Sequence, residues 1–180
     1  EAVHLMLRES ENNVAEILFR QVAIAAGQPA TWAGGQRAAR AALTALALDP
    51  TGLTLADGSG LSRTDRLSAQ LLAELLRITR ADARFAAMYE PDALPIAGRT
   101  GTLATRYDRY TTKPSKCAVG AVRGKTGTLF DTIGLSGFTT AQDGQEKTFA
   151  ILVNHRPNRV ARLATRQAVD GLAATINGCW

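Results

Sequence analysis

The stretch GAVRGKTGTLF, residues 120–130, decides between two folds for this chain of 180 residues. Its Gly-Lys-Thr would end a nucleotide-binding P-loop if a further glycine stood five residues before Gly124. That position holds Val119, and Gly120 is out of register by one residue. A P-loop also leads into a helix whose N-terminus holds the phosphate, whereas strand-like sequence follows here. The pattern therefore disfavours a P-loop, and Lys125-Thr126-Gly127 needs another explanation.

Three strand-like segments crowd around this stretch, at about 119–126, 132–140 and 147–154. The last of them has a continuous apolar run, which is typical of a strand covered on both faces. Asp143-Gly144 precedes it and predicts a hairpin turn. A further short strand is expected at 53–55, and the proline-containing stretch 90–118 is expected to be irregular.

Apolar residues recur at helical spacing in most of the remaining sequence. They predict helices over 2–8, 12–26, 33–47 and 158–176, one that Ser68 caps, and a short one near 82–88. Helices therefore precede an antiparallel meander, and one helix follows it. This order predicts an α+β fold in which an antiparallel sheet is flanked by helices.

The composition is that of an ordinary globular protein, with 46% hydrophobic and 21% charged residues. No apolar run is long enough to span a bilayer. The net charge is +5, but the arginines are scattered and only 6% of residues are aromatic, so nucleic-acid binding is not predicted. The chain begins at Glu1 with helix-like sequence, and we expect this end to be a cut in a longer polypeptide.

The cysteines and histidines do not form a recognisable metal site. Cys117 and Cys179 lack the four-ligand spacing of structural zinc. The sequence leaves open whether they form one disulfide, which an exported protein would allow, or two separate thiols. His4 and His155 have no evident carboxylate partners for a metal, and no Gly-x-Ser-x-Gly elbow supports a Ser-His-Asp triad.

Lys-Thr-Gly has a second known use, in acyl-serine enzymes that recognise penicillin. These enzymes combine it with a Ser-x-x-Lys and a Ser-x-Asn. Ser10-Glu11-Asn12 matches Ser-x-Asn and lies between two predicted helices. Taken alone, this triplet is explained equally well by Ser10 acting as a helix N-cap. The combination of both triplets is more informative than either one.

Four segments follow one another in a recognisable order: RESENNVAEILFR (8–20), DGSGLSR (57–63), GRTGTL (98–103) and RGKTGTL (123–129). They resemble the low-molecular-mass penicillin-binding proteins of the D-Ala-D-Ala carboxypeptidase and endopeptidase class, peptidase family S13. The resemblance covers essentially the whole chain. It implies that residues 1–180 are the C-terminal part of a β-lactamase/transpeptidase-like domain.

The resemblance implies a serine-type D-Ala-D-Ala carboxypeptidase, with DD-endopeptidase activity as a further option. Such an enzyme acts on peptidoglycan stem peptides outside the cytoplasmic membrane, forms an acyl-enzyme and is inhibited by β-lactams. It needs no metal or organic cofactor. Within DGSGLSR, we expect the conspicuous residues to build a structural loop near the site: Asp57, Gly58, Ser59, Gly60 and Arg63.

The same resemblance assigns catalytic roles to three residues. Ser10 would relay a proton to the leaving amine. The amide of Asn12 would hold a substrate carbonyl so that the scissile bond lies in line. The charge of Lys125 would favour the anionic end of D-Ala-D-Ala and tune nearby protons.

Three residues on the following strand are assigned to substrate binding. The hydroxyl of Thr126 would bind the terminal carboxylate. Gly127, without a side chain, would let the substrate approach the strand. The backbone N–H of Thr128 would be one donor of the oxyanion hole.

The nucleophile motif Ser-x-x-Lys is absent from this sequence. The only lysines are 113, 116, 125 and 147, and three residues before them stand Tyr110, Lys113, Val122 and Gly144. The resemblance places that motif upstream of Ser-x-Asn, so we expect a companion N-terminal segment to supply it and this chain alone to be inactive.

Two alternatives to a carboxypeptidase remain at the level of sequence. One is a non-catalytic penicillin-binding-like module that recognises cell-wall peptides, and the other is a β-lactamase, which shares the three motifs. An upstream Ser-x-x-Lys in the parent polypeptide would exclude the first alternative, and slow deacylation would exclude the second.

Overall fold

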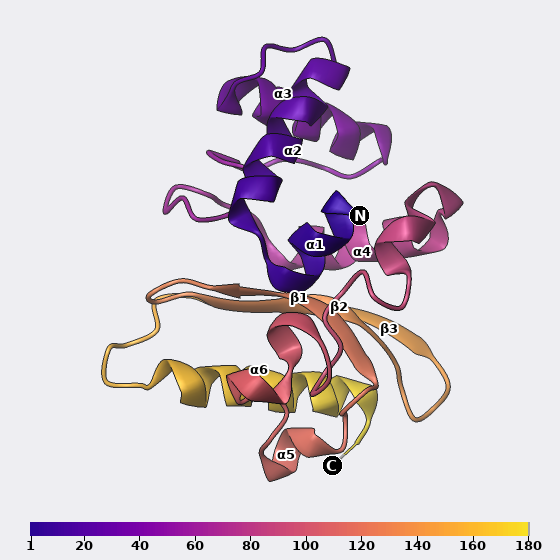
Figure 1. Cartoon of the computed structure of the whole chain (residues 1–180), viewed down its shortest axis with the longest axis vertical. Helices are drawn as coiled ribbons and strands as arrows, with labels where there is room; N and C mark the ends of the chain where they lie inside the picture. The colour runs from indigo at the N-terminus through magenta and orange to yellow at the C-terminus, as the bar shows by residue number, and fades with distance from the viewer. Residues whose placement is uncertain (180) are drawn as a thin grey trace.

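The computed structural model describes residues 1–179, in which a three-stranded antiparallel sheet has helices on both faces (Figure 1). The strands are β1 (Val122–Thr128), β2 (Ile133–Thr140) and β3 (Glu146–Val153), in the order β1-β2-β3. In the register of β1 and β2, Lys125 lies opposite Ser136. The predicted α+β class and the meander are confirmed, and β1 begins three residues later than its predicted start at 119.

The helices that the apolar spacing predicts are all present, with ends shifted by a few residues. The α-helices are α1 (Ala2–Glu9), α2 (Asn12–Ala25), α3 (Trp32–Ala45), α4 (Ala69–Ala81), α5 (Lys113–Lys116) and α6 (Arg162–Asn177). Shorter 3-10 turns are η1 (Ala83–Tyr89), η2 (Gly101–Leu103) and η3 (Thr105–Tyr107). The Ser68 hydroxyl accepts a hydrogen bond from the Leu71 N–H at 3.0 Å and so caps α4, as predicted.

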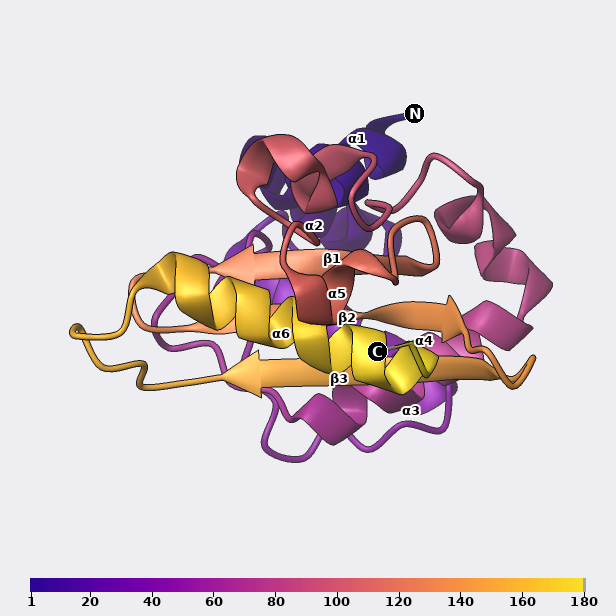
Figure 2. The same ribbon diagram turned by 90° about the horizontal axis from the view of Figure 1, so that it is seen from below.

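The sheet is buried between α6 on one face and α4 on the other (Figures 1 and 2). Leu135 of β2 and Phe149 of β3 pack in one cluster with Val169 and Ala173 of α6. Gly178 ends α6 in the left-handed region, at φ 88°. Burial on both faces explains why β3 has a continuous apolar run rather than strict alternation.

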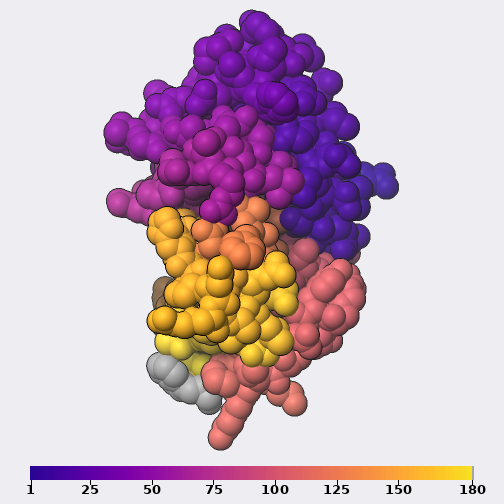
Figure 3. Space-filling view, turned by 90° about the vertical axis from the view of Figure 1, so that its left-hand side faces the viewer, coloured from indigo at the N-terminus to yellow at the C-terminus, as the bar shows by residue number. Residues whose placement is uncertain are grey.

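The chain is arranged in two halves along its length. Figure 3 shows the N-terminal helices, indigo to purple, gathered in one half, and the last strands with α6, orange to yellow, in the other. α4 contacts β2 and β3, and the corner between α1 and α2 lies close to β1 in Figure 1. A site built at this junction therefore takes residues from both ends of the sequence.

Two further features stabilise the half that contains the sheet. The buried Arg109 guanidinium donates to both carboxylate oxygens of Asp170 on α6, with an Nε–Oδ2 distance of 2.9 Å. Cys117 and Cys179 form a disulfide with a Cα–Cα distance of 5.9 Å, within the usual range. The structure therefore selects the disulfide from the two options that the sequence left open.

One local prediction is wrong, and one alternative explanation is excluded. Residues 53–55 form no strand, because Thr54 makes only an isolated bridge with Arg66. Ser10 is not an N-cap: it ends α1, and Glu11 occupies the cap position of α2 without a side-chain hydrogen bond. Ser10 is thereby left available for contacts across the junction.

Candidate active site

Ser10 lies at the sharp corner between α1 and α2. Its backbone is left-handed, with φ 62° and ψ 47°, a conformation that few residues other than glycine adopt. The corner packs closely against Gly101, where a Cβ atom would lie 2.4 Å from the carbonyl oxygen of Arg8. Gly101, the second glycine of GRTGTL, thus allows the corner between α1 and α2 to approach β1.

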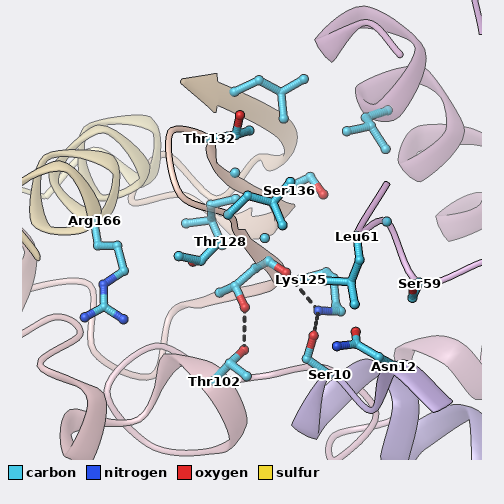
Figure 4. A pocket seen from close by; sticks show the side chains of 18 of the residues that line it. Ser10, Asn12, Ser59, Leu61, Thr102, Lys125, Thr128, Thr132, Ser136 and Arg166 are labelled. Carbon is cyan, nitrogen blue, oxygen red and sulfur yellow. Dashed lines mark hydrogen bonds between the residues drawn. The ribbon is translucent and has the colours of Figure 1, made fainter. Parts of the chain in front are cut away.

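Lys125 joins this corner to β1. Its Nζ donates hydrogen bonds to the Ser10 Oγ at 2.5 Å and to the Thr126 carbonyl oxygen at 2.8 Å (Figure 4). Burial lowers the pKa of the Lys125 amine to about 8. Because this amine contacts only neutral oxygens, it can hold or release a proton near neutral pH and exchange it with the hydroxyl of Ser10.

Asn12 begins α2, two residues after Ser10, and its exposed side chain lines the same cavity. Figure 4 shows Ser10, Asn12 and Lys125 grouped together at one side of that cavity. The two motifs, which are more than a hundred residues apart in sequence, therefore meet in space as the resemblance implies.

Thr126 contacts a residue for which the sequence predicted no site role. Its Oγ1 donates a hydrogen bond to the Oγ1 of Thr102 at 2.7 Å, and Thr102 lies in η2 and lines the cavity. The sequence signal that could have pointed to Thr102 is the similarity between GRTGTL and GKTGTL. In the sequence alone, the preference of Gly-Thr-Gly for turns explains this similarity equally well. The structure instead places the two segments side by side.

The C-terminal half of β1 presents a free edge to the cavity. The first half of that edge is occupied, because the Gly124 N–H donates to the Pro95 carbonyl at 3.1 Å. Beyond it, a Cβ atom on Gly127 would have no neighbour within 4 Å. Thr128 follows at the end of the strand. An extended peptide can pair with such an edge through its backbone.

The loop 57–63 forms another wall of the cavity and is held by carboxylates. Glu16 accepts hydrogen bonds from the N–H groups of Gly58 and Ser59, both at 3.0 Å. Asp57 accepts from the N–H groups of Gly60 and Ser62, both at 2.7 Å. These bonds fit the structural role that the sequence predicts for the loop.

The outer end of the same loop is tied to the turn between β1 and β2. The Arg63 guanidinium forms a bidentate ion pair with the Asp131 carboxylate. Its hydrogen bond is the largest cause that lowers the pKa of Asp131 to about 2.

Residues from the corner, β1, η2 and the loop 57–63 surround one cavity of about 550 Å³, a size typical of small-molecule sites. The six site residues predicted from sequence all line it: Ser10, Asn12, Lys125, Thr126, Gly127 and Thr128. Further lining comes from Ser59, Leu61, Thr102, Arg109 and Arg166. The described residues contain no group of three or more His, Cys, Asp or Glu placed to hold a metal ion.

A model of the D-Ala-D-Ala carboxypeptidase 3 (S13) family matches residues 1–176. The chain belongs to this family. Carboxypeptidase DacB of Mycolicibacterium smegmatis is 37% identical over 179 residues, which cover 99% of this chain and 37% of that protein. The D-alanyl-D-alanine carboxypeptidase of Actinomadura sp. is 33% identical over 91% of this chain and 29% of that protein.

Solved structures agree with the family assignment. Penicillin binding protein 4 (dacB) from Haemophilus influenzae superimposes with a TM-score of 0.85 and 26% identity, over 98% of this chain and 39% of that one. A second structure of that protein, in complex with a β-lactam, gives a TM-score of 0.83. The resemblance found in the sequence is confirmed. This S13 chain spans about two fifths of these relatives' length or less.

Proposed function

We propose that this chain forms the Ser-x-Asn and Lys-Thr-Gly side of the active site of a serine-type D-Ala-D-Ala carboxypeptidase. The substrates are peptidoglycan stem peptides, and β-lactams inhibit the enzyme by acylating it. A companion segment, outside the 180 residues, carries the Ser-x-x-Lys nucleophile. The observation that carries this proposal is the hydrogen bond from the Lys125 Nζ to the Ser10 Oγ, because it joins the two motifs in one cavity.

The hydrogen-bond direction supports a proton relay through Ser10. Because its Oγ accepts from Lys125, its own O–H hydrogen is free to point into the cavity. When the nucleophile attacks the carbonyl of the penultimate D-Ala, the leaving nitrogen takes this hydrogen and Lys125 replaces it. Asn12 orients the substrate carbonyl, and the Thr128 N–H stabilises the oxyanion.

The free edge of β1 supports a mode of substrate binding. The stem peptide lies extended along Gly127, and its terminal carboxylate accepts a hydrogen bond from the hydroxyl of Thr126. The Cys117–Cys179 disulfide supports work outside the cytoplasm, because disulfides persist in oxidising compartments. Among residues 1–179, the helices are all too short or too polar to cross a bilayer.

The test uses the polypeptide that contains this chain together with its Ser-x-x-Lys segment. We expect benzylpenicillin to add one equivalent of its mass to that segment and none to residues 1–180, as measured by peptide mass spectrometry. Release of D-Ala from an N-acylated Lys-D-Ala-D-Ala tripeptide should accompany it. The variant Lys125→Ala should lose both activities, whereas Lys147→Ala, on β3 and outside the cavity lining, should keep them.

Each alternative function has its own signature in the same experiment. A penicillin adduct without any release of D-Ala would favour a recognition module. Rapid loss of the adduct, with turnover of benzylpenicillin and no peptide cleavage, would indicate a β-lactamase. A penicillin adduct on residues 1–180 would overturn the assignment of the nucleophile.

A further inference from the structure

The cavity carries more positive charge than the proposed chemistry uses. Three cationic side chains line it, Arg109, Lys125 and Arg166, and no Asp or Glu does. The charge of Arg109 is compensated by the buried carboxylate of Asp170. The resemblance assigns the charge of Lys125 to the anionic end of the substrate, but in the structure its Nζ donates to the Ser10 Oγ and the Thr126 carbonyl oxygen, at the scissile end of the cavity. Arg166 is therefore a second charged group in the cavity that has no assigned role.

The position of Arg166 is set by α6, the helix that covers the opposite face of the sheet. The side chain is half-buried, and its Nε is buried without a hydrogen-bond partner among the described residues. Because this Nε is already enclosed by protein atoms, a ligand in the cavity would meet the two terminal nitrogens of the guanidinium, which is part of the cavity lining. Figure 4 shows Arg166 on the side of Thr102 and Thr128 that faces away from Ser10 and Asn12.

That side is where the substrate must place its negative charge. The carboxylate of D-Ala-D-Ala lies one residue beyond the scissile amide, on the side of the leaving group. Ser10 and Lys125 mark the scissile end of the cavity, and Thr102, which accepts a hydrogen bond from Thr126, lies between them and Arg166 (Figure 4). A guanidinium can hold a carboxylate with two parallel hydrogen bonds, which a hydroxyl alone cannot do.

We propose that Arg166 binds the free terminal carboxylate of the peptide and so makes the enzyme prefer a terminal D-Ala. This inference rests on the proposed function and adds a specificity-determining residue to it. A peptide that continues beyond the second D-residue presents a neutral amide at the same place. It gains nothing from the guanidinium and leaves that charge unpaired, so cleavage at a chain end is favoured over cleavage of a cross-link.

The test compares two substrates that differ only in terminal charge. They are an N-acylated Lys-D-Ala-D-Ala tripeptide and its C-terminal amide, given to the full polypeptide with the Ser-x-x-Lys segment. For Arg166→Gln, kcat/KM should fall about 10- to 100-fold on the free acid, the range of a hydrogen bond to a charged group, and little on the amide. Arg166→Lys should recover part of the loss, because lysine keeps the positive charge but cannot donate two parallel hydrogen bonds to the carboxylate.

Arg162→Gln is the matched control. Arg162 lies one turn earlier on α6, is exposed and does not line the cavity, so its removal changes the net charge by the same amount. Its acid-to-amide ratio of kcat/KM should equal that of the wild type. Thermal unfolding of each variant identifies any that fails to fold. If Arg166→Gln does not fold, the acid-to-amide ratio of kcat/KM in Arg166→Lys tests the role of Arg166 instead.

The outcomes separate this inference from the proposed function. If the wild type releases D-Ala but the ratio is the same in Arg166→Gln and Arg162→Gln, the role of Arg166 is overturned and the proposed function stands. An equal loss on both substrates overturns it as well, because it indicates a structural role. If the wild type cleaves neither substrate, the proposed function itself fails.

Discussion

At the scale of single residues, the Lys125 amine determines how the site responds to pH. Burial lowers its pKa to about 8, which means that the charged form is disfavoured in the fold. The cation is therefore present below pH 8 and is lost as the pH rises through 8, rather than near the ordinary value of about 10.4. Any catalytic role that needs the protonated Lys125 amine is therefore lost as the pH rises through 8.

We therefore expect the acylation rate with a β-lactam to fall with a midpoint near pH 8 on the alkaline side. The variant Lys125→Arg is the control, because an arginine keeps its charge to above about pH 12. It should show lower activity but no decline near pH 8. Second-order acylation rates measured from pH 6 to 10 check this, and an alkaline limb that persists unchanged in Lys125→Arg would assign it to another group.

At the scale of elements, the corner between α1 and α2 depends on how closely it packs against η2. A Cβ atom on Gly101 would lie 2.4 Å from the Arg8 carbonyl oxygen, and φ at Gly101 is 54°. The variant Gly101→Ala should therefore displace the corner and move Ser10 away from Lys125. It should lower the free energy of unfolding and slow acylation more than its stability loss explains.

Gly52→Ala separates strain from packing in this experiment. Gly52 also has positive φ, at 76°, but a Cβ atom there would have no neighbour within 4 Å. It should cost only the left-handed strain of about 1–2 kcal/mol and leave acylation unchanged. Denaturant unfolding and acylation rates compare the two variants. Equal effects of the two substitutions would contradict the role of the Gly101 contact.

The same elements show what the sequence can predict and what it cannot. Periodicity predicts α2, α6 and the meander because their apolar faces are buried locally and regularly. The six site residues were predicted through the motif resemblance, which carries their spatial relation implicitly. Thr102 was not predicted to be a site residue, because its contact with Thr126 depends on tertiary packing. The sequence left an N-cap as the alternative explanation for Ser10, since a serine after one helix and before another satisfies both local patterns.

At the scale of the whole molecule, one covalent link holds the last helix to the segment that leads into β1. The Cys117–Cys179 disulfide closes a separation of 62 residues, and a loop of this length stabilises a fold by about 4 kcal/mol in the chain-entropy estimate. Val169 and Ala173, just before the second cysteine, form part of the core under the sheet. Loss of the link should therefore loosen α6 against β2.

Reduction should then lower the melting temperature of the full polypeptide by several degrees, because 1 kcal/mol shifts it by about 2–4 °C in a domain of 150–250 residues and by less in a larger one. The double variant Cys117→Ser/Cys179→Ser should melt at the temperature of the reduced wild type and should not respond to reductant. Calorimetry with and without a thiol reductant measures both. Because Arg166 is carried by the same helix, a loosened α6 should also reduce the preference for a free terminal carboxylate while leaving cleavage of the amide substrate largely unchanged. A reduced protein with unaltered melting and unaltered preference would mean that the core packing of α6 is sufficient without the disulfide.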